Sequence, residues 1–289
     1  MNTAKRAPRK ALRTAAVMTL GFGLLAAAQT VFAAGPTTVG LGTAAPFAVL
    51  AGTPAITNTG PSTITGNVGI APALAVTGFP PGTVGGATHK GDAIAIQAQS
   101  DLTTAYTDAA GRSVTATHGT LGGLTLIAGV YTAGGTTLDL TGTLTLDGQN
   151  DPNAVWIFQA TSDLVTASSS TVNLINGASP CNVFWQVTSS ATLGSGSTFV
   201  GTIMALTSIT MASGVSLDGR ALARNGQVTL INDTIDSRAC SGAIPETDSV
   251  ATTTDGSGSI PVVLFAGTFG LALIGFLIVR RPTRRIRDR

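Results

Sequence analysis

The sequence predicts a mainly β protein, a three-sided β-solenoid with one long α-helix packed alongside it. Short apolar segments recur at intervals of 18 or 19 residues, and apolar and polar residues alternate within each of them. One segment of about 20 residues replaces this alternation with helical spacing. An ordinary β-sandwich with evenly spaced strands is the alternative that such a pattern leaves open.

The repeat is clearest in the second half of the chain. Thr192, Thr210 and Thr229 lie 18 and 19 positions apart, in segments of matching pattern. Two more series repeat at intervals of 18 residues: Trp185, Ile203 and Ala221, and Phe199 and Leu217. Three short strands in every turn of about 18 residues predict a coil with three sides.

Earlier coils follow the same pattern less regularly. Residues 155–174 resemble residues 183–201 at an offset of 27, because the turn-rich stretch 176–180 is inserted between them. Segments 47–65 and 130–146 have the alternation of further coils. The repeat therefore extends over most of the chain.

Residues 91–110 are predicted to form the helix. Their apolar positions fall at helical spacing: Ile94, Ala98, Leu102, Ala105, Tyr106 and Ala109. The strand around Trp185 is apolar on both of its alternating faces, so we expect its outer side to be covered as well. The helix is expected to lie along that side of the solenoid and to serve packing rather than function.

The N-terminal residues 1–33 are predicted to be a secretory signal peptide. Five basic and no acidic residues precede an apolar stretch, which ends in Val31-Phe32-Ala33. A buried N-terminal helix is the alternative. We expect the folded part to begin at about residue 35.

A transmembrane helix is predicted at residues 260–279, which are twenty residues without a charge. Six Arg follow in the basic tail 280–289, and basic residues stay on the cytoplasmic side of a membrane. We therefore expect a single-pass cell-membrane protein with an extracellular ectodomain, residues 35–240, and a cytoplasmic C-terminus. Residues 241–259 lack periodicity and indicate a flexible tether. Within it, Ile244–Asp248 resembles a cell-wall sorting signal, but we prefer a retained membrane anchor to processing by a sortase.

Composition argues against nucleic-acid binding and against catalysis. Five bases and thirteen acids lie between residues 35 and 259, which gives this part a net charge of −8 and no basic patch for nucleic acid. His89 and His118 lack metal-ligand spacing, and Asp147–Asp151 lacks the Glu that would close a calcium loop. We expect no enzyme activity, no metal and no cofactor.

One side of the coil is the candidate binding surface. In the Thr-bearing strands the apolar residues point inward, so their polar neighbours point outward. The outward residues are Ser190, Thr192, Ser208, Thr210, Gln227 and Thr229. Stacked coils place equivalent residues about 4.8 Å apart, which makes a flat stripe with almost no charge. Thr is favoured on any half-exposed strand, so a purely structural explanation of the stripe is also open.

Several stretches of the sequence resemble the microbial ice-binding protein family. They are APFAVLAGTPAITNTGPSTITGNVGIAP (45–72), VTGFPPGTV (76–84), DAIAIQAQSDLTTAYTDAAGR (92–112), NVFWQVTSSATLGSGSTFVGTIMALTSITM (182–211) and GRALARNGQVTL (219–230). The resemblance covers roughly residues 40–237 in order, including the non-repetitive parts. It implies a discontinuous, right-handed β-solenoid of triangular section with a long helix alongside. It also implies binding of ice through one flat face of Thr, Ser and small residues.

By position, the six outward residues named above form that face. An earlier coil of the same side carries Thr137, Asp139 and Thr141. The chain departs from the family pattern where Asp163 and Val165 replace an expected hydroxyl pair, and where Gln227 is bulkier than Thr.

Two functional hypotheses follow. The first is a surface-anchored ice-binding protein, of antifreeze or ice-adhesion type, whose partners are an ice crystal surface and, through residues 260–279, a membrane. The alternative is a structural or adhesive cell-surface protein on the same scaffold, with a ligand other than ice.

Cys181 and Cys240 form a possible disulfide in an oxidising compartment. They are separated by about three coils, or ~14 Å along the stack, whereas a bridge needs Cα atoms within about 7 Å of each other. The bridge therefore requires residues 173–182 or the C-terminal segment to fold back along the solenoid.

Overall fold

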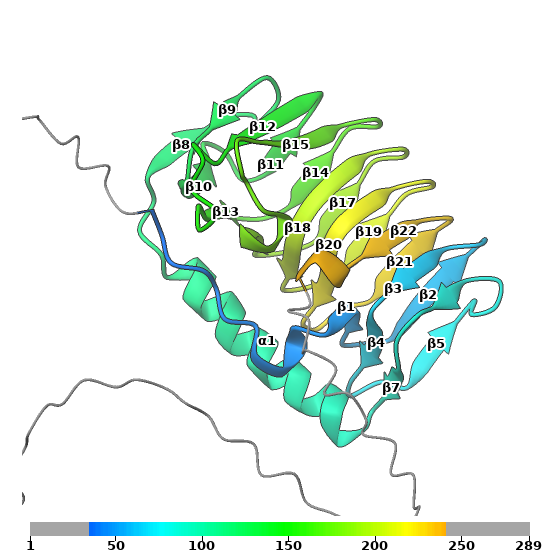
Figure 1. Cartoon of the computed structure of the whole chain (residues 1–289). Helices are drawn as coiled ribbons and strands as arrows, with labels where there is room; N and C mark the ends of the chain where they lie inside the picture. The colour runs from blue at the N-terminus through cyan, green and yellow to red at the C-terminus, as the bar shows by residue number, and fades with distance from the viewer. Residues whose placement is uncertain (1–34, 241–289) are drawn as a thin grey trace, which may run out of the picture. The chain divides into compact units, whose positions relative to one another are not determined.

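The computed structural model describes residues 35–240, a mainly β body whose paired strands run parallel. Each full coil contributes strands to three faces, which we call A, B and C (Figure 1). The single α-helix, α1 (Ala93–Ala110), lies outside the coils. Mainly parallel β-structure with one helix is the fold class that the sequence predicts.

The strands divide among the three faces as follows. Face A consists of β1 (Phe47–Ala51), β4 (Asn67–Ile70), β7 (Thr88–Lys90), β8 (Ala116–His118), β10 (Gly129–Ala133), β13 (Trp156–Ala160), β16 (Val183–Val187) and the second halves of β18 (Thr198–Ala205) and β20 (Ser216–Ala223). Face B consists of β2 (Ala55–Thr59), β5 (Ala75–Thr77), β11 (Leu138–Leu140), β14 (Leu164–Thr166), β17 (Ala191–Leu193), β19 (Ile209–Met211) and β21 (Val228–Ile231). Face C consists of β3 (Thr63–Thr65), β6 (Thr83–Val84), β9 (Thr125–Leu126), β12 (Thr143–Asp147), β15 (Thr171–Ile175), β22 (Thr234–Asp236) and the first halves of β18 and β20.

Two long strands, β18 and β20, carry the chain around the corner from face C to face A. The corner falls at Gly201 and Gly219, whose φ angles are +105° and +152°. A Cβ atom at Gly201 would lie 2.5 Å from the carbonyl oxygen of Val183. Glycine is therefore needed both for the backbone conformation and for the close approach of the next coil.

The chain does not climb the stack from one end to the other. Residues 47–90 form the coils at one end, α1 then runs along the stack, and β8 starts the remaining coils at the opposite end (Figure 1). These coils return until the last one meets the first. There Val49 pairs with Ala221, Thr57 with Thr229, and Ile64 with Ile235. We call this joint the seam.

Apolar side chains fill the interior of the coils. In each of the face B strands β11, β14 and β17, the first and third residues are buried and the middle residue is exposed. This is the pattern of a strand with one side in solvent. Aromatic rings stack through successive coils, with centroids 4.1 Å apart for Phe158 and Trp185 and 4.6 Å apart for Trp185 and Phe199. The indole N–H of Trp185 donates to the carbonyl of Val200 at 2.8 Å, so its burial leaves no polar group unpaired.

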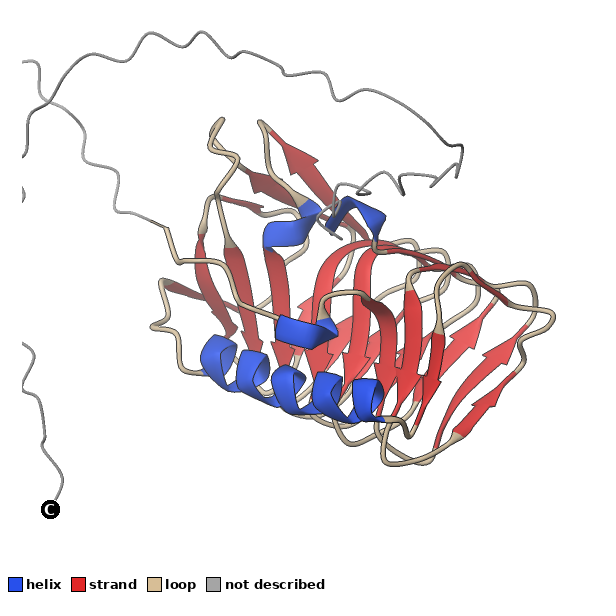
Figure 2. Cartoon of the chain, turned by 60° about the horizontal axis from the view of Figure 1, so that its bottom comes forward, coloured by secondary structure: helices blue, strands red, loops and turns tan. Residues whose placement is uncertain are grey.

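The helix covers the outer side of face A, as expected from the sequence (Figure 2). Strands β13 and β16 are buried along their whole length. Phe184 packs with the helix residues, whereas Trp185 belongs to the interior of the coil. The buried helix residues are Ala95, Ala98, Leu102, Ala105, Tyr106 and Ala109.

One position of the expected apolar stripe is wrong. Ile94 is 53% exposed, and Ala95 occupies the buried position instead. The helix begins at Ala93, and the carboxylate of Asp92 caps it by accepting a hydrogen bond from the Ala95 N–H at 2.8 Å. Successive helical residues point about 100° apart, so residue 94 turns away from face A when residue 95 faces it.

Two glutamines of face A hold the helix in place. The Gln159 amide donates to the carbonyls of Ala109 and Arg112, at 2.8 and 2.9 Å. The last carbonyls of a helix lack partners within the helix, so this side chain satisfies its C-terminal end. The Gln186 amide donates to the Tyr106 hydroxyl at 2.8 Å.

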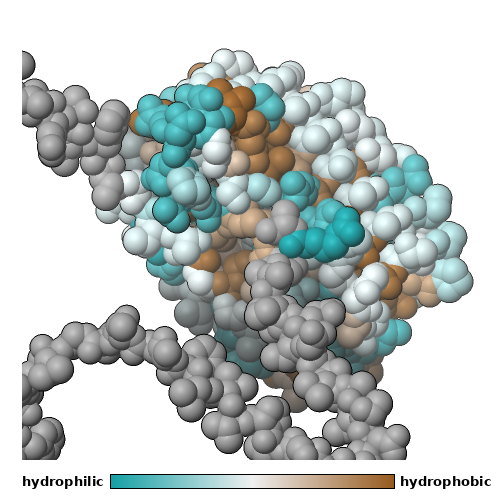
Figure 3. Space-filling model, viewed as in Figure 1, coloured by the Kyte–Doolittle hydropathy of each residue, from teal (hydrophilic) through white to brown (hydrophobic). Residues whose placement is uncertain are grey.

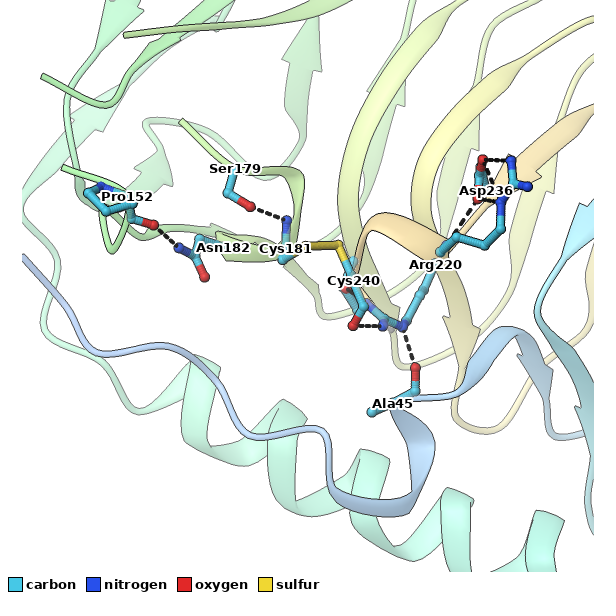
Figure 4. Close-up of a disulfide and its surroundings, with 10 residues drawn as sticks. Ala45, Pro152, Ser179, Cys181, Asn182, Arg220, Asp236 and Cys240 are labelled. Carbon is cyan, nitrogen blue, oxygen red and sulfur yellow. Dashed lines mark hydrogen bonds and ion pairs between the residues drawn. A yellow bond between two sulfur atoms is a disulfide. The ribbon is translucent and has the colours of Figure 1, made fainter. Parts of the chain in front are cut away.

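Cys181 and Cys240 are joined by a disulfide, with their Cα atoms 4.9 Å apart (Figure 4). Two short 3-10 turns bring them together. The first, η2 (Pro180–Asn182), lies against β18, and the second, η3 (Arg238–Cys240), lies against β20. These turns supply the fold-back along the solenoid that the separation of the two coils requires.

A buried arginine beside the disulfide connects the beginning and the end of the described chain (Figure 4). Arg220 is 2% exposed, and it donates to the Ala45 carbonyl at 2.7 Å and to the Cys240 carbonyl at 2.8 Å. Burial lowers its pKa to about 10, so the guanidinium remains charged at neutral pH. Removal of this side chain would leave two carbonyls without their donor.

A buried carboxyl group lies at the seam. Asp233 is 1% exposed and accepts hydrogen bonds from the N–H groups of Val215 and Ile231, at 2.8 and 2.7 Å. Its own N–H donates to the Ser62 hydroxyl on the other side of the seam at 2.9 Å. Burial raises its pKa to about 6, against the opposing effect of the N–H donors. Among residues 35–240, no Lys or Arg forms an ion pair with it.

Within residues 35–240, no helix is both long and apolar enough to cross a membrane. The predicted signal peptide (1–33), tether (241–259), transmembrane helix (260–279) and basic tail (280–289) lie outside the described residues.

The disulfide predicts a loss of stability on its removal. The double variant Cys181→Ser, Cys240→Ser should unfold with a free energy lower by about 2–4 kcal/mol, because the bridge restricts the unfolded chain between these positions. Urea denaturation of parent and variant, each with and without a thiol reductant, measures the difference. A reductant effect of equal size in the double variant would show that the bridge is not its source.

Because the pKa of Asp233 is raised in the folded protein, we predict that the free energy of unfolding increases as the pH falls from 7.5 to 5. Its folded pKa of about 6 exceeds the unfolded value of 3.8, so the folded state binds more protons between these limits. The gain should be about 1.4 kcal/mol, at roughly 1.4 kcal/mol per pKa unit. Carboxyls whose pKa is lowered in the folded protein, such as Asp163 and Asp101, have the opposite effect. Their contribution to stability is lost only when they become protonated, below about pH 4. Denaturation midpoints at both pH values test this, and an unchanged gain in Asp233→Asn would contradict it.

Candidate functional site

The residues predicted for the binding face come from three stacked coils of face B. The register pairs Thr192 with Thr210 and Thr210 with Thr229, so these three side chains stand in one row along the stack. Their strands bury the residues on either side, which turns the Thr side chains toward solvent. The structure therefore brings together the three Thr residues that the repeat aligns.

The row continues across the seam onto the N-terminal coils. Thr229 pairs with Thr57, and Thr57 pairs with Thr77. The hydroxyl of Thr57 donates to that of Thr229 at 3.3 Å. Five Thr residues thus stand on five consecutive coils, and we call them the threonine file: Thr192, Thr210, Thr229, Thr57 and Thr77.

Sequence reasoning missed Thr57 and Thr77. The segment Ala55-Ile56-Thr57 has the same apolar–Thr pattern as Val228-Thr229, and this was the available signal. The spacing along the chain does not show, however, that the first coil lies on the last. Only the seam makes these residues neighbours of Thr229.

The file is interrupted at its other end. Thr192 pairs with Val165, which is 38% exposed, and Val165 pairs with the exposed Asp139. Thr137 is half-buried and Thr141 is exposed at the two edges of the same coil. Two of the departures from the family pattern, Asp163 and Val165, therefore lie at this end of face B, whereas the third, Gln227, lies beside Thr229.

Ser190, Ser208 and Gln227 form the neighbouring column, and their contacts differ from those of the file. The Ser190 hydroxyl accepts a hydrogen bond from the Ser208 N–H at 3.4 Å, and the Ser208 hydroxyl accepts one from the Gln227 N–H at 3.3 Å. The Gln227 amide donates to the Thr229 hydroxyl at 3.4 Å. The two serines thus bond to neighbouring coils and the Gln227 side chain bonds within its own strand. All three residues are half-buried, as Thr210 and Thr229 are.

Asp163 continues this column one coil before Ser190. Its carboxylate accepts hydrogen bonds from the Ser190 N–H at 3.1 Å and from the Ser162 hydroxyl at 2.9 Å. These donors lower the pKa of Asp163, so that it is ionised at neutral pH. Its charge lies beyond Thr192, outside the threonine file.

The geometry of the file suits binding rather than chemistry. Hydroxyl and methyl groups recur about every 4.8 Å on a rigid backbone, and none of the five residues is charged. Within the described part of the chain, no three His, Cys, Asp or Glu side chains are grouped to hold a metal ion. A row of uncharged hydroxyls at regular intervals can hold water or another periodic ligand at those same intervals.

Proteins named as ice-binding proteins have sequences similar to that of this chain. The ice-binding protein of Nostoc sp. (strain HG1) is 48% identical over 220 residues, which cover 72% of this chain and 80% of the relative. The ice-binding protein of Colwellia sp. is 37% identical over 229 residues, covering 72% of this chain and 87% of the relative.

Solved structures agree with the fold. An ice-binding protein from an Antarctic biological consortium superimposes with a TM-score of 0.69 at 44% identity, covering 71% of this chain and 93% of the other. An ice-binding protein from the Antarctic ascomycete Antarctomyces psychrotrophicus gives a TM-score of 0.66 at 39% identity. The match covers 70% of this chain and 98% of the other. The sequence model described as ice-binding-like matches residues 49–236, from the first coil through the helix to the last strand. The chain therefore belongs to the ice-binding-like protein family.

Proposed function

We propose that the protein binds ice through face B and acts by adsorption to the crystal rather than by catalysis. The observation that carries the proposal is the threonine file, in which five Thr side chains stand in register on consecutive coils. The relatives that are named ice-binding proteins support ice as the ligand.

The physical basis is agreement between two periodic surfaces. Each Thr hydroxyl can take the place of one water in an ordered layer, and each methyl leaves the neighbouring water to bond with other water. A charged group would instead orient water around itself, and the file has none. A single contact is weak, but contacts made on one rigid body act together, so binding depends on the number of sites in register. The seam supplies two of the five sites.

We further propose that the protein is exported and held at the cell membrane by residues 260–279, with the solenoid outside. The support comes from the sequence: a basic and then apolar start that is typical of a signal peptide, and twenty uncharged residues followed by six Arg. Protease treatment of intact cells tests this orientation. The solenoid should be released, whereas a label placed after residue 289 should stay protected.

The substitutions Thr210→Tyr and Thr57→Tyr should each weaken adsorption to ice, by roughly tenfold in Kd for a loss of ~1.4 kcal/mol of binding free energy. Thermal hysteresis should fall as a result. A Tyr ring stands above the level of the neighbouring Thr side chains and holds the ice surface away from them. Thr104→Tyr is the matched control, because Thr104 is exposed on α1, away from face B.

Thermal hysteresis and ice recrystallisation of the full chain measure these effects. Equal activity of all three variants would show that face B is not the binding surface. Absence of any effect of the parent on ice would refute ice binding and favour the adhesive alternative, with another surface as ligand.

The substitution Val165→Thr should increase thermal hysteresis at equal protein concentration. It adds a sixth hydroxyl in register with Thr192, at a position that is already exposed. Val114→Thr is the control, since Val114 is 45% exposed in the loop after the helix. An equal response of both variants would mean that added hydroxyl content, and not the length of the file, determines activity.

A further inference from the structure

Face C carries a second row of hydroxyl side chains, and this row has no interruption. The register connects seven residues on consecutive coils, which we call the hydroxyl file: Thr143, Thr171, Thr198, Ser216, Thr234, Thr63 and Thr83. It crosses the seam between Thr234 and Thr63. Face B, by contrast, has Val165 and Asp139 in its corresponding row.

The hydroxyls of this file are available to water. All seven residues are exposed except Thr171, which is half-buried. Within residues 35–240, only the Thr83 hydroxyl bonds to another protein group, the Ser62 carbonyl at 3.5 Å. Hydroxyls elsewhere on the coils commonly bond to the neighbouring coil, as those of Ser190 and Thr188 do. The hydroxyl file is therefore a row of hydrogen-bonding groups that the protein itself leaves unused.

Charged groups of face C lie to one side of the file. Asp218 and Asp236 occupy the column two residues further along their strands, toward the corner with face A. Asp236 pairs with Arg238 at 2.7 Å, and burial of Asp218 together with the nearby charge of Asp236 raises the pKa of Asp218. The file lies at the other edge of the face, next to the corner with face B, where Figure 3 shows pale, near-neutral spheres along the coil tips.

The corner between faces B and C is narrow, and in Figure 1 it forms the row of tips at the upper right. The threonine file lies on one side of these tips and the hydroxyl file on the other. The two files are inclined to each other on a rigid body, so they cannot lie flat on the same plane of a crystal. A ligand bound by both files must therefore offer two differently oriented surfaces.

We propose that the hydroxyl file is a second ice-binding surface, which adsorbs to a crystal plane other than the one bound by the threonine file. The inference rests on the proposed function of face B. It follows from the same physical requirement, uncharged hydroxyls in register on consecutive coils, which face C meets over seven coils.

The experiment uses the full chain carrying a fluorescent label and a single crystal of ice of known orientation. The parent should label two sets of crystal planes. Thr234→Tyr should lose one set, Thr210→Tyr should lose the other, and the double variant should lose both. Thr104→Tyr, on the helix, should label the same planes as the parent. Thr63→Tyr repeats the test on the neighbouring coil, should Thr234→Tyr fold poorly.

Other labelling patterns separate the failure of this inference from failure of the proposed function. If Thr234→Tyr and Thr63→Tyr label the parent's planes and Thr210→Tyr labels none, face C does not bind ice and face B alone does. If Thr234→Tyr removes all labelling and Thr210→Tyr removes none, face B is wrongly assigned and two surfaces are excluded. A parent that labels no plane refutes ice binding itself.

Discussion

The pairing of the first coil with the last is the constraint on which the rest of the structure depends. β1, β2 and β3 find parallel partners in β20, β21 and β22, about 172 residues later in the chain. Contacts between such distant residues require a large loss of chain entropy before they form. The helix makes them possible, because it carries the chain along the stack in one straight segment and lets the later coils grow back toward the first. Both rows of hydroxyls are continuous only because this seam is in register.

The interior is mostly apolar, but the few buried polar side chains lie where separate segments must be held together. Asp233 and Ser62 meet across the seam, Gln159 satisfies the end of the helix, and Arg220 joins the two ends of the described chain. Burial of each polar side chain costs free energy because the group loses its contacts with water. Hydrogen bonds to backbone groups that would otherwise lack partners offset this loss. Apolar contacts favour collapse in any register, whereas these bonds have fixed partners and so favour a single arrangement of the segments.

The sequence predicted the features that depend on local periodicity. The interval of 18 residues gave the pairs Trp185–Ile203 and Thr192–Thr210 in the register that the structure contains. The helix and the face that it covers followed from apolar spacing, with an error at Ile94. Residues 94 and 95 both lie about one turn before Ala98, and Ala95 is the one nearer the centre of the buried stripe. The position of the N-terminal coils in the stack could not be predicted from the sequence. A repeat shows which residues occupy equivalent positions in a coil, but it does not show which coils are neighbours. For this reason Thr57, Thr77 and the continuity of the hydroxyl file emerged only from the structure.

The disulfide also determines how the body bears a mechanical load. A force applied at Cys240 passes through the bridge to Cys181, three coils away, and through Arg220 to the Ala45 carbonyl at the start of the first coil. Strands in a solenoid separate easily when the terminal one is peeled away rung by rung. Here Cys240 is bound to the middle of the stack, so a pull on it is shared among several coils. Under the proposed attachment through residues 260–279 and the proposed binding of ice, this sharing of force decides whether adsorption or the fold fails first.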